Sequence, residues 1–225
     1  MEWDDSARRT ARQRCKQQDH RLWIHKTDRQ SGRVALPGAT LLVAALAGCT
    51  ARPPSAPAPV ASVPADAHVV ELPVSTTRRE ASGPAVLFSG ERQPDSRFAN
   101  MSISIPPGHV VGDISWAQNG QLDPATHFTA AGARHLASAN FTTTLRERIA
   151  LAGRSHVLVF EHGYNTRFDE AAFRFAWIVH DSGAKVTPVM FSWASWGTVS
   201  AFSYDRVSAE IARNGLESLL TRAGE

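Results

Sequence analysis

Two kinds of apolar pattern occupy the second half of the chain. Residues 156–160 and 189–193 are short, nearly unbroken apolar runs, which are typical of strands buried on both faces of a parallel sheet. Each run is followed by a segment with helical spacing, at about residues 168–179 and 204–220. Strand, helix, strand and helix with short links predict a parallel, right-handed βαβ arrangement.

Both predicted helices carry an apolar stripe that would pack on the sheet. The stripe of the first comprises Phe168, Ala171, Ala172, Phe175, Ala176 and Val179. Thr166, with Asp169 three residues later, predicts its N-cap, and Gly183 predicts its C-cap. The buried face of the second helix is expected to hold Ala209, Ala212, Leu216, Leu219 and Leu220.

The strand signals upstream are shorter. Residues 68–74 and 85–89 are predicted as short strands, and residues 101–105 alternate apolar and polar positions, as in a half-buried strand. Residues 112–139 are mixed and polar, which predicts a loop with at most short irregular helix. A helix is expected over residues 142–152, with Leu145, Ile149 and Ala152 on one face.

An apolar run at residues 34–47 follows Arg29 and Arg33. It is shorter than the about 20 residues that a membrane-spanning helix needs, and its length suits the apolar region of an export signal. Leu46-Ala47-Gly48-Cys49 resembles the bacterial lipobox, in which the cysteine, here Cys49, becomes acylated. We therefore expect an exported protein that is anchored to the membrane through Cys49. By analogy with lipoprotein sorting, Thr50 favours the periplasmic side of the outer membrane. The alternative is a buried core segment.

Composition limits the other classes of function. The net charge of the 225 residues is +3, and the basic excess lies in residues 1–33, so no nucleic-acid interface is expected. That polar segment is either a disordered cytoplasmic extension or the result of a misplaced start, with Val34 as one alternative start. The two cysteines and scattered histidines show no disulfide framework and no zinc spacing, and we expect no metal or cofactor.

The predicted chemistry lies in the loops after Phe160 and Trp193, because ligands bind beyond the carboxyl ends of strands in open α/β sheets. His162-Gly163-Tyr164-Asn165 occupies the first loop. Gly163 allows the backbone to bend so that peptide N–H groups point toward an oxygen that becomes negative in a transition state. Each such donor is worth about 3–4 kcal/mol in hydrolases.

Several motifs together resemble a known family. They are the loop 162–165, the segments Phe191-Ser192-Trp193-Ala194-Ser195 and Tyr204–Ala209, and an upstream strand that ends in Ile105-Pro106-Pro107. From about residue 85 to residue 220, the chain resembles a family of bacterial α/β hydrolases of uncharacterised function, DUF900. The resemblance implies a doubly wound, mostly parallel sheet whose C-terminal half is missing. Residues 50–66 would then be a Pro/Ala-rich tether between the signal at 34–49 and the hydrolase domain at 67–225.

The resemblance also implies a serine hydrolase of the esterase or lipase kind. The backbone N–H of Tyr164 is then the best candidate for an oxyanion donor, beside Gly163, and His162 orients the loop. Trp193 and Trp196 would either line the substrate pocket or act as aromatic plugs over the core. Glu161 departs from the family pattern, in which an apolar residue is more usual.

The nucleophile that such a fold uses is not in this sequence. No Gly-x-Ser-x-Gly elbow occurs, and all three triad members come at or after that elbow in α/β hydrolases. We therefore expect an inactive fragment of an enzyme that acts on a small ester or acyl substrate. Ser192, Ser195 and Ser200 are expected to be turn serines. The alternative is a non-catalytic envelope lipoprotein that uses a degenerate fold for binding.

Overall fold

The computed structural model describes residues 59–83, 86–117, 122–152 and 156–224. The expectations for the export signal, the lipobox and Cys49 fall on residues 1–58 and lie outside the described residues. Within the described ranges, no helix combines the length and the apolar character needed to cross a membrane.

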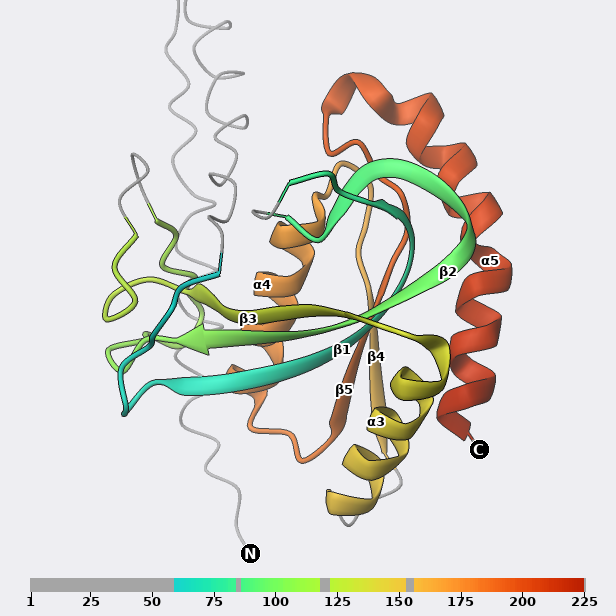
Figure 1. Ribbon diagram of the computed structural model, residues 1–225. Helices are drawn as coiled ribbons and strands as arrows, with labels where there is room; N and C mark the ends of the chain where they lie inside the picture. The colour runs from blue at the N-terminus through green and yellow to red at the C-terminus, as the bar shows by residue number, and fades with distance from the viewer. Residues whose placement is uncertain (1–58, 84–85, 118–121, 153–155, 225) are drawn as a thin grey trace, which may run out of the picture. The chain divides into compact units, whose positions relative to one another are not determined.

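A five-stranded sheet with the order β3-β2-β1-β5-β4 forms the centre of the fold (Figure 1). The strands are β1 (His68–Glu80), β2 (Phe88–Ile105), β3 (Thr129–Leu136), β4 (Val157–Glu161) and β5 (Thr187–Ser192). β4 and β5 pair in parallel, as do β1 and β5, whereas β2 runs antiparallel to both β1 and β3. The predicted βαβ unit is therefore confirmed, within a sheet that is mixed.

Helices cover both faces of the sheet. α4 (Phe168–Ser182) packs with β1 and β2 in one hydrophobic cluster, which includes Leu72, Ile103 and Phe175. α3 (Ser138–Leu151) and α5 (Phe202–Gly224) contribute Phe141 and Leu219 to a second cluster. A short 3₁₀ helix, η1 (Val199–Ala201), precedes α5. The fold is thus a three-layer α/β/α arrangement of the α/β-hydrolase type (Figure 1).

The predictions for the helices are confirmed in their main features and wrong in detail. The stripe of α4 is buried from Phe168 to Ala176, and Gly183 ends the helix in the left-handed region at φ 58°. Thr166 does not cap α4, because the residue before the helix is Arg167 and the Thr166 hydroxyl donates to the Tyr164 carbonyl instead. α5 turns Asp205, Ser208, Ala212 and Leu219 inward, whereas the predicted Ala209 and Leu220 are exposed.

The strand predictions for the first half were too short. β1 continues past its predicted end at residue 74 to Glu80, and β2 joins the strands predicted at residues 85–89 and 101–105 into one of 18 residues. Residues 101–105 are not half-buried: Ile103, Ser104 and Ile105 are each 0% exposed, because helices lie over both faces of the sheet. β3 lies within the segment that was predicted to be a loop.

β4 is less buried than the sequence predicted. The sequence predicted a strand buried on both faces, but residues 157–160 are half-buried and Glu161 is exposed. β4 is only half-buried because it is an edge strand: among the described strands it pairs with β5 alone. β5, which lies between β1 and β4, is almost fully buried.

Candidate functional site

Three strands end together at one side of the sheet. Glu161 of β4 is in register with Phe191 of β5, and Ser192 of β5 is in register with Thr76 of β1. The loops after β4 and β5 therefore lie next to each other, beside the last residues of β1. The register of β1 with β2 shifts on both sides of Arg78, as at a β-bulge, and such irregularities re-aim side chains near functional sites.

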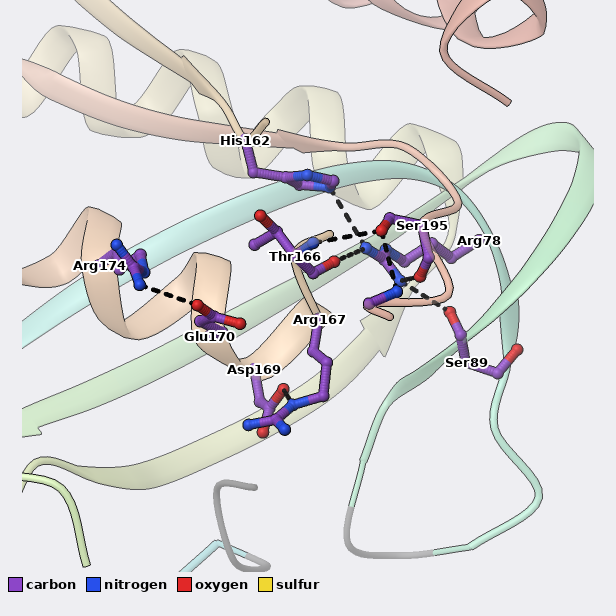
Figure 2. Close-up of polar contacts among 10 residues, drawn as sticks. Arg78, Ser89, His162, Thr166, Arg167, Asp169, Glu170, Arg174 and Ser195 are labelled. Carbon is purple, nitrogen blue, oxygen red and sulfur yellow. Dashed lines mark hydrogen bonds and ion pairs between the residues drawn. The ribbon is translucent and has the colours of Figure 1, made fainter. Parts of the chain in front are cut away.

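Arg78 is the polar centre of this region, and its side chain is buried at 1% exposure. Its Nε donates to Ser192 Oγ at 2.9 Å, and its Nη2 donates to the Thr166 carbonyl at 2.9 Å. Nη1 donates to the carbonyls of Ser89 at 3.1 Å and Ser195 at 2.9 Å. Figure 2 shows Ser89, Thr166 and Ser195 around the guanidinium of Arg78. Arg78 therefore ties the start of β2 to both loops.

The environment of Arg78 is unusual for a buried cation, because its hydrogen-bond partners are carbonyls, a hydroxyl and an imidazole. Burial lowers the pKa of Arg78 to about 10, and the charge of Asp205 opposes that shift. The guanidinium thus stays protonated at neutral pH. Its planar set of donors suits several acceptors that diverge around it.

His162 is also buried, at 5% exposure. Its Nε2 lies 3.0 Å from Ser192 Oγ and 3.3 Å from Arg78 Nη2, and its Nδ1 lies 2.9 Å from the Gly163 carbonyl. Burial, and then the charge of Arg78, lower the pKa of His162 to about 3. The ring is therefore neutral, so Nδ1–H donates to Gly163 while Nε2 accepts from Arg78 and Ser192.

Asp205 fixes the backbone of the loop from the first turn of α5, where its side chain is 1% exposed. Its carboxylate accepts from Ser195 Oγ at 2.6 Å and from the amides of Asn165 at 3.1 Å and Trp196 at 3.0 Å. The Thr166 amide in turn donates to Ser195 Oγ at 3.2 Å. Two consecutive amides of the loop are thereby turned toward this cluster. The turn places Asn165 at φ 59°, which asparagine tolerates better than most residues.

The amides of the two preceding residues have a different environment. Within the described residues, the structure shows no protein acceptor for the amides of Gly163 and Tyr164. Both residues line a hollow of about 460 Å³ between the end of β4 and α4. Glu161 and the Arg174–Glu170 ion pair also line this hollow, and burial raises the pKa of the Glu161 carboxyl. The hollow lies at the edge strand of the sheet.

The two tryptophans singled out from the sequence, Trp193 and Trp196, do not line this hollow. Trp193 is 5% exposed and packs against the His162 ring, where its Nε1 donates to the His162 carbonyl at 3.0 Å. Trp196 is 46% exposed and lines a separate hollow of about 150 Å³ beside Arg78. The Tyr164 hydroxyl donates to the Val199 carbonyl, and its ring meets Phe202 edge to face.

The three serines after β5 have different environments. Ser195 is 1% exposed and accepts from the amides of Thr166 and Gly197, which is the role of a turn serine. Ser192 is fully buried between Arg78 and His162. The Ser200 hydroxyl lies 3.4 Å from the Thr198 hydroxyl. Of these, Ser192 and Ser195 are buried and engaged in the network that holds the loop.

Two residues that organise the site were missed by the sequence analysis. Asp205 had a usable signal, because an acid in the first turn of a helix can bind backbone amides that come near it. Arg78 had none, because an arginine after a run of β-formers is most often a solvated residue at a strand end. Its burial follows from the packing of β5 and both loops around the end of β1.

The comparison with protein families concerns this part of the chain. Residues 137–224, from the start of α3 to the end of α5, match the family described as "Alpha/beta hydrolase of unknown function (DUF900)". No curated protein and no solved structure matches the chain. The matched segment contains β4, β5 and both loops of the site. Over these residues, the chain is similar to α/β hydrolases of the DUF900 family.

Proposed function

We propose that this chain provides the oxyanion-binding part of a lipid-anchored serine hydrolase that cleaves small esters or related acyl bonds. The observation that carries the proposal is the pair of backbone amides at Gly163 and Tyr164, which line a hollow and have no protein acceptor within the described residues. Both residues are exposed, so their N–H groups are accessible to water or to an oxygen of a ligand. Two neighbouring accessible amides that line a hollow at a strand end are suited to bind such an oxygen.

The proposed chemistry uses these amides in the transition state. When a nucleophile adds to the carbonyl carbon of an ester, the carbonyl oxygen becomes an oxyanion, and the N–H groups of Tyr164 and Gly163 donate to it. Donors that are fixed before the reaction need no reorganisation, and each contributes about 3–4 kcal/mol. The next two amides donate to Asp205 and to Ser195 Oγ, and His162 Nδ1 donates to the Gly163 carbonyl, which supports such a fixed loop.

The nucleophile, the acid and the histidine base are proposed to come from sequence outside residues 1–225, because no Gly-x-Ser-x-Gly elbow occurs in the chain. The side of β4 that pairs with no described strand supports this proposal. Unpaired strand edges are aggregation hazards that proteins usually cover. A further parallel strand on β4 would end beside Gly163 and Tyr164, and would place a nucleophile at the hollow.

The N-terminal segment gives the proposed location. We propose that Cys49 is acylated and holds the hydrolase on the periplasmic side of the outer membrane. Growth with a labelled fatty acid tests this, because the wild-type protein should incorporate label and Cys49→Ala should not. Equal labelling of Cys49→Ala, or no labelling of either protein, would rule out the anchor without touching the hydrolase proposal.

Hydrolysis of p-nitrophenyl acyl esters tests the catalytic part. The 225-residue chain should show no turnover, whereas the product extended in frame through the next strand and triad should be active. In that product, Gly163→Pro removes one amide donor and should lower kcat by about 10²–10³-fold. Gly163→Ala is the matched control, because a Cβ at this position meets no atom within 4 Å. Saturable turnover by the 225-residue chain, lost on mutation of a residue within it, would overturn the proposal.

A further inference from the structure

Imidazole and carboxylate side chains gather at the end of the sheet away from the candidate site. His109 follows β2, and His180 and Asp181 lie in the last turn of α4. His68 begins β1, whose amino end is opposite the strand ends that carry His162. These groups come from three parts of the sequence, and the fold alone brings them together.

The ligand atoms of three of these residues are close enough to share an ion. One atom each from His109, His180 and Asp181 lie within 4.8 Å of one another, and His109 Nε2 is 2.6 Å from Asp181 Oδ1. The His180 ring lies 5.3 Å from the His109 ring and 4.7 Å from the His68 ring, centroid to centroid. The three residues are part-buried, which shields the group and leaves it open to solvent ions.

A second observation concerns His109. Its side chain is only 4% exposed, and its Nδ1 is buried without a hydrogen-bond partner within the described residues. A hydrogen bond between His109 and Asp181 alone satisfies one ring nitrogen and leaves the other unpaired, at a cost of about 1–3 kcal/mol. Because Nε2 is the nitrogen that contacts Asp181, it is also the nitrogen placed to bind a shared ion, and Nδ1 lies on the far side of the ring.

The carboxylate is already oriented by groups behind it. Asp181 Oδ2 accepts from the Gly112 amide at 2.7 Å and from Trp177 Nε1 at 2.6 Å. These bonds leave Oδ1 directed toward His109. Support of this kind, in which hydrogen bonds hold a ligating carboxylate in place, is a general feature of metal sites.

We propose that His109, His180 and Asp181 bind a divalent transition-metal ion of the Zn²⁺ class, which joins the loop after β2 to the end of α4. Two imidazoles and one carboxylate are a ligand set that zinc accepts, with a fourth position for water. Metal–ligand distances of about 2.0–2.2 Å place neighbouring tetrahedral ligands roughly 3.3 Å apart. The separations in the structure bracket that value, so a rotation of His180 toward the other two would close the site.

The sequence could not reveal this site. Metal motifs are recognised by two ligands at short, fixed spacing, and adjacent His180 and Asp181 form no such motif. The third ligand, His109, lies on a different segment and approaches only because α4 ends beside the loop after β2. The expectation of no metal rested on that missing spacing.

Zinc binding by the full chain, purified with a tag that contains no histidine, tests the proposal. Equilibrium dialysis at micromolar free Zn²⁺ should give one bound ion per chain that a chelator removes. His180→Ala should weaken binding at least about tenfold, as expected for loss of a direct ligand. His156→Ala is the matched control, since His156 is exposed at the same end of the sheet and should leave binding unchanged.

A second variant and a spectrum make the outcome decisive. Asp181→Asn keeps the shape of the side chain and should also weaken binding at least about tenfold, which decides the matter if His180→Ala does not fold. X-ray absorption at the zinc edge should show two imidazole ligands. Absence of stoichiometric zinc in the wild type, or wild-type affinity in the folded variants, would overturn the proposal.

Discussion

Replacement of Arg78 by methionine is the most informative test of how the site is held. The guanidinium makes five hydrogen bonds: to three carbonyls, to Ser192 Oγ and to His162 Nε2. At a net value of about 1 kcal/mol each, their loss would cost about 5 kcal/mol. Methionine recovers part of this, because it fills space and no longer buries a charge, whose desolvation costs several kcal/mol.

We therefore expect Arg78→Met to lower the free energy of unfolding by about 3–5 kcal/mol, from the balance of those contributions. For a domain of this size, that change lowers the Tm by roughly 6–20 °C. Arg78→Lys should be intermediate, because an ammonium keeps the charge but cannot reproduce the planar set of donors. Urea unfolding followed by circular dichroism measures these differences.

The adjacent arginine provides the matched control. Arg79 is paired with Glu91 at 2.6 Å, but the two side chains are 60% and 45% exposed. A surface pair of this kind is worth at most about 1 kcal/mol, so Arg79→Met should unfold close to the wild type. If Arg78→Met and Arg79→Met unfold at the same urea concentration, Arg78 does not hold the loops as we describe.

Two further predictions concern stability. Because the pKa of His162 is lowered from 6.5 to about 3, its contribution to stability is complete above about pH 6.5 and is lost as the pH falls toward about 3. Over that range, the free energy of unfolding of the wild type should fall by up to about 1.4 kcal/mol per pH unit more than that of His162→Asn. Parallel pH profiles of the two proteins would contradict this prediction. A Cβ at Gly90 would lie 3.0 Å from the Ser195 carbonyl oxygen, so Gly90→Ala should cost about 1–3 kcal/mol. Gly83→Ala is the control, because a Cβ there meets no atom within 4 Å, and its stability should be closer to that of the wild type. Equal stability of Gly90→Ala and Gly83→Ala would show that the contact between Gly90 and the Ser195 carbonyl is not tight.

The part of the fold that the sequence predicts is the part with strong local signals. The stripe from Phe168 to Ala176, ended by Gly183, gives α4 within a residue or two, and the two apolar runs give β4 and β5. The position of β4 at the sheet edge has no local signal, because an apolar run looks the same at the centre and at the edge. β3 was missed for a similar reason, since its sequence is stabilised as a strand by pairing with β2.

The candidate site also has one part that local sequence predicts and another part that depends on tertiary contacts. The loop from His162 to Asn165 follows from a glycine after a buried strand, which is a local feature. The groups that hold this loop, Arg78 and Asp205, lie 84 and 40 residues away from His162 and Asn165 respectively, and only tertiary contacts identify them. Arginine and aspartate side chains are usually solvated, whereas Arg78 and Asp205 are buried, and a single sequence does not show burial.

The most direct test of the oxyanion site is a crystal structure of the in-frame extended product after reaction with a p-nitrophenyl alkylphosphonate. The tetrahedral phosphonyl adduct on the nucleophile would mimic the transition state. We expect its oxygen to lie about 2.7–3.1 Å from the backbone nitrogens of Gly163 and Tyr164, with the contacts of Arg78 and Asp205 unchanged. An adduct whose oxygen binds elsewhere, with both amides facing water, would contradict the account.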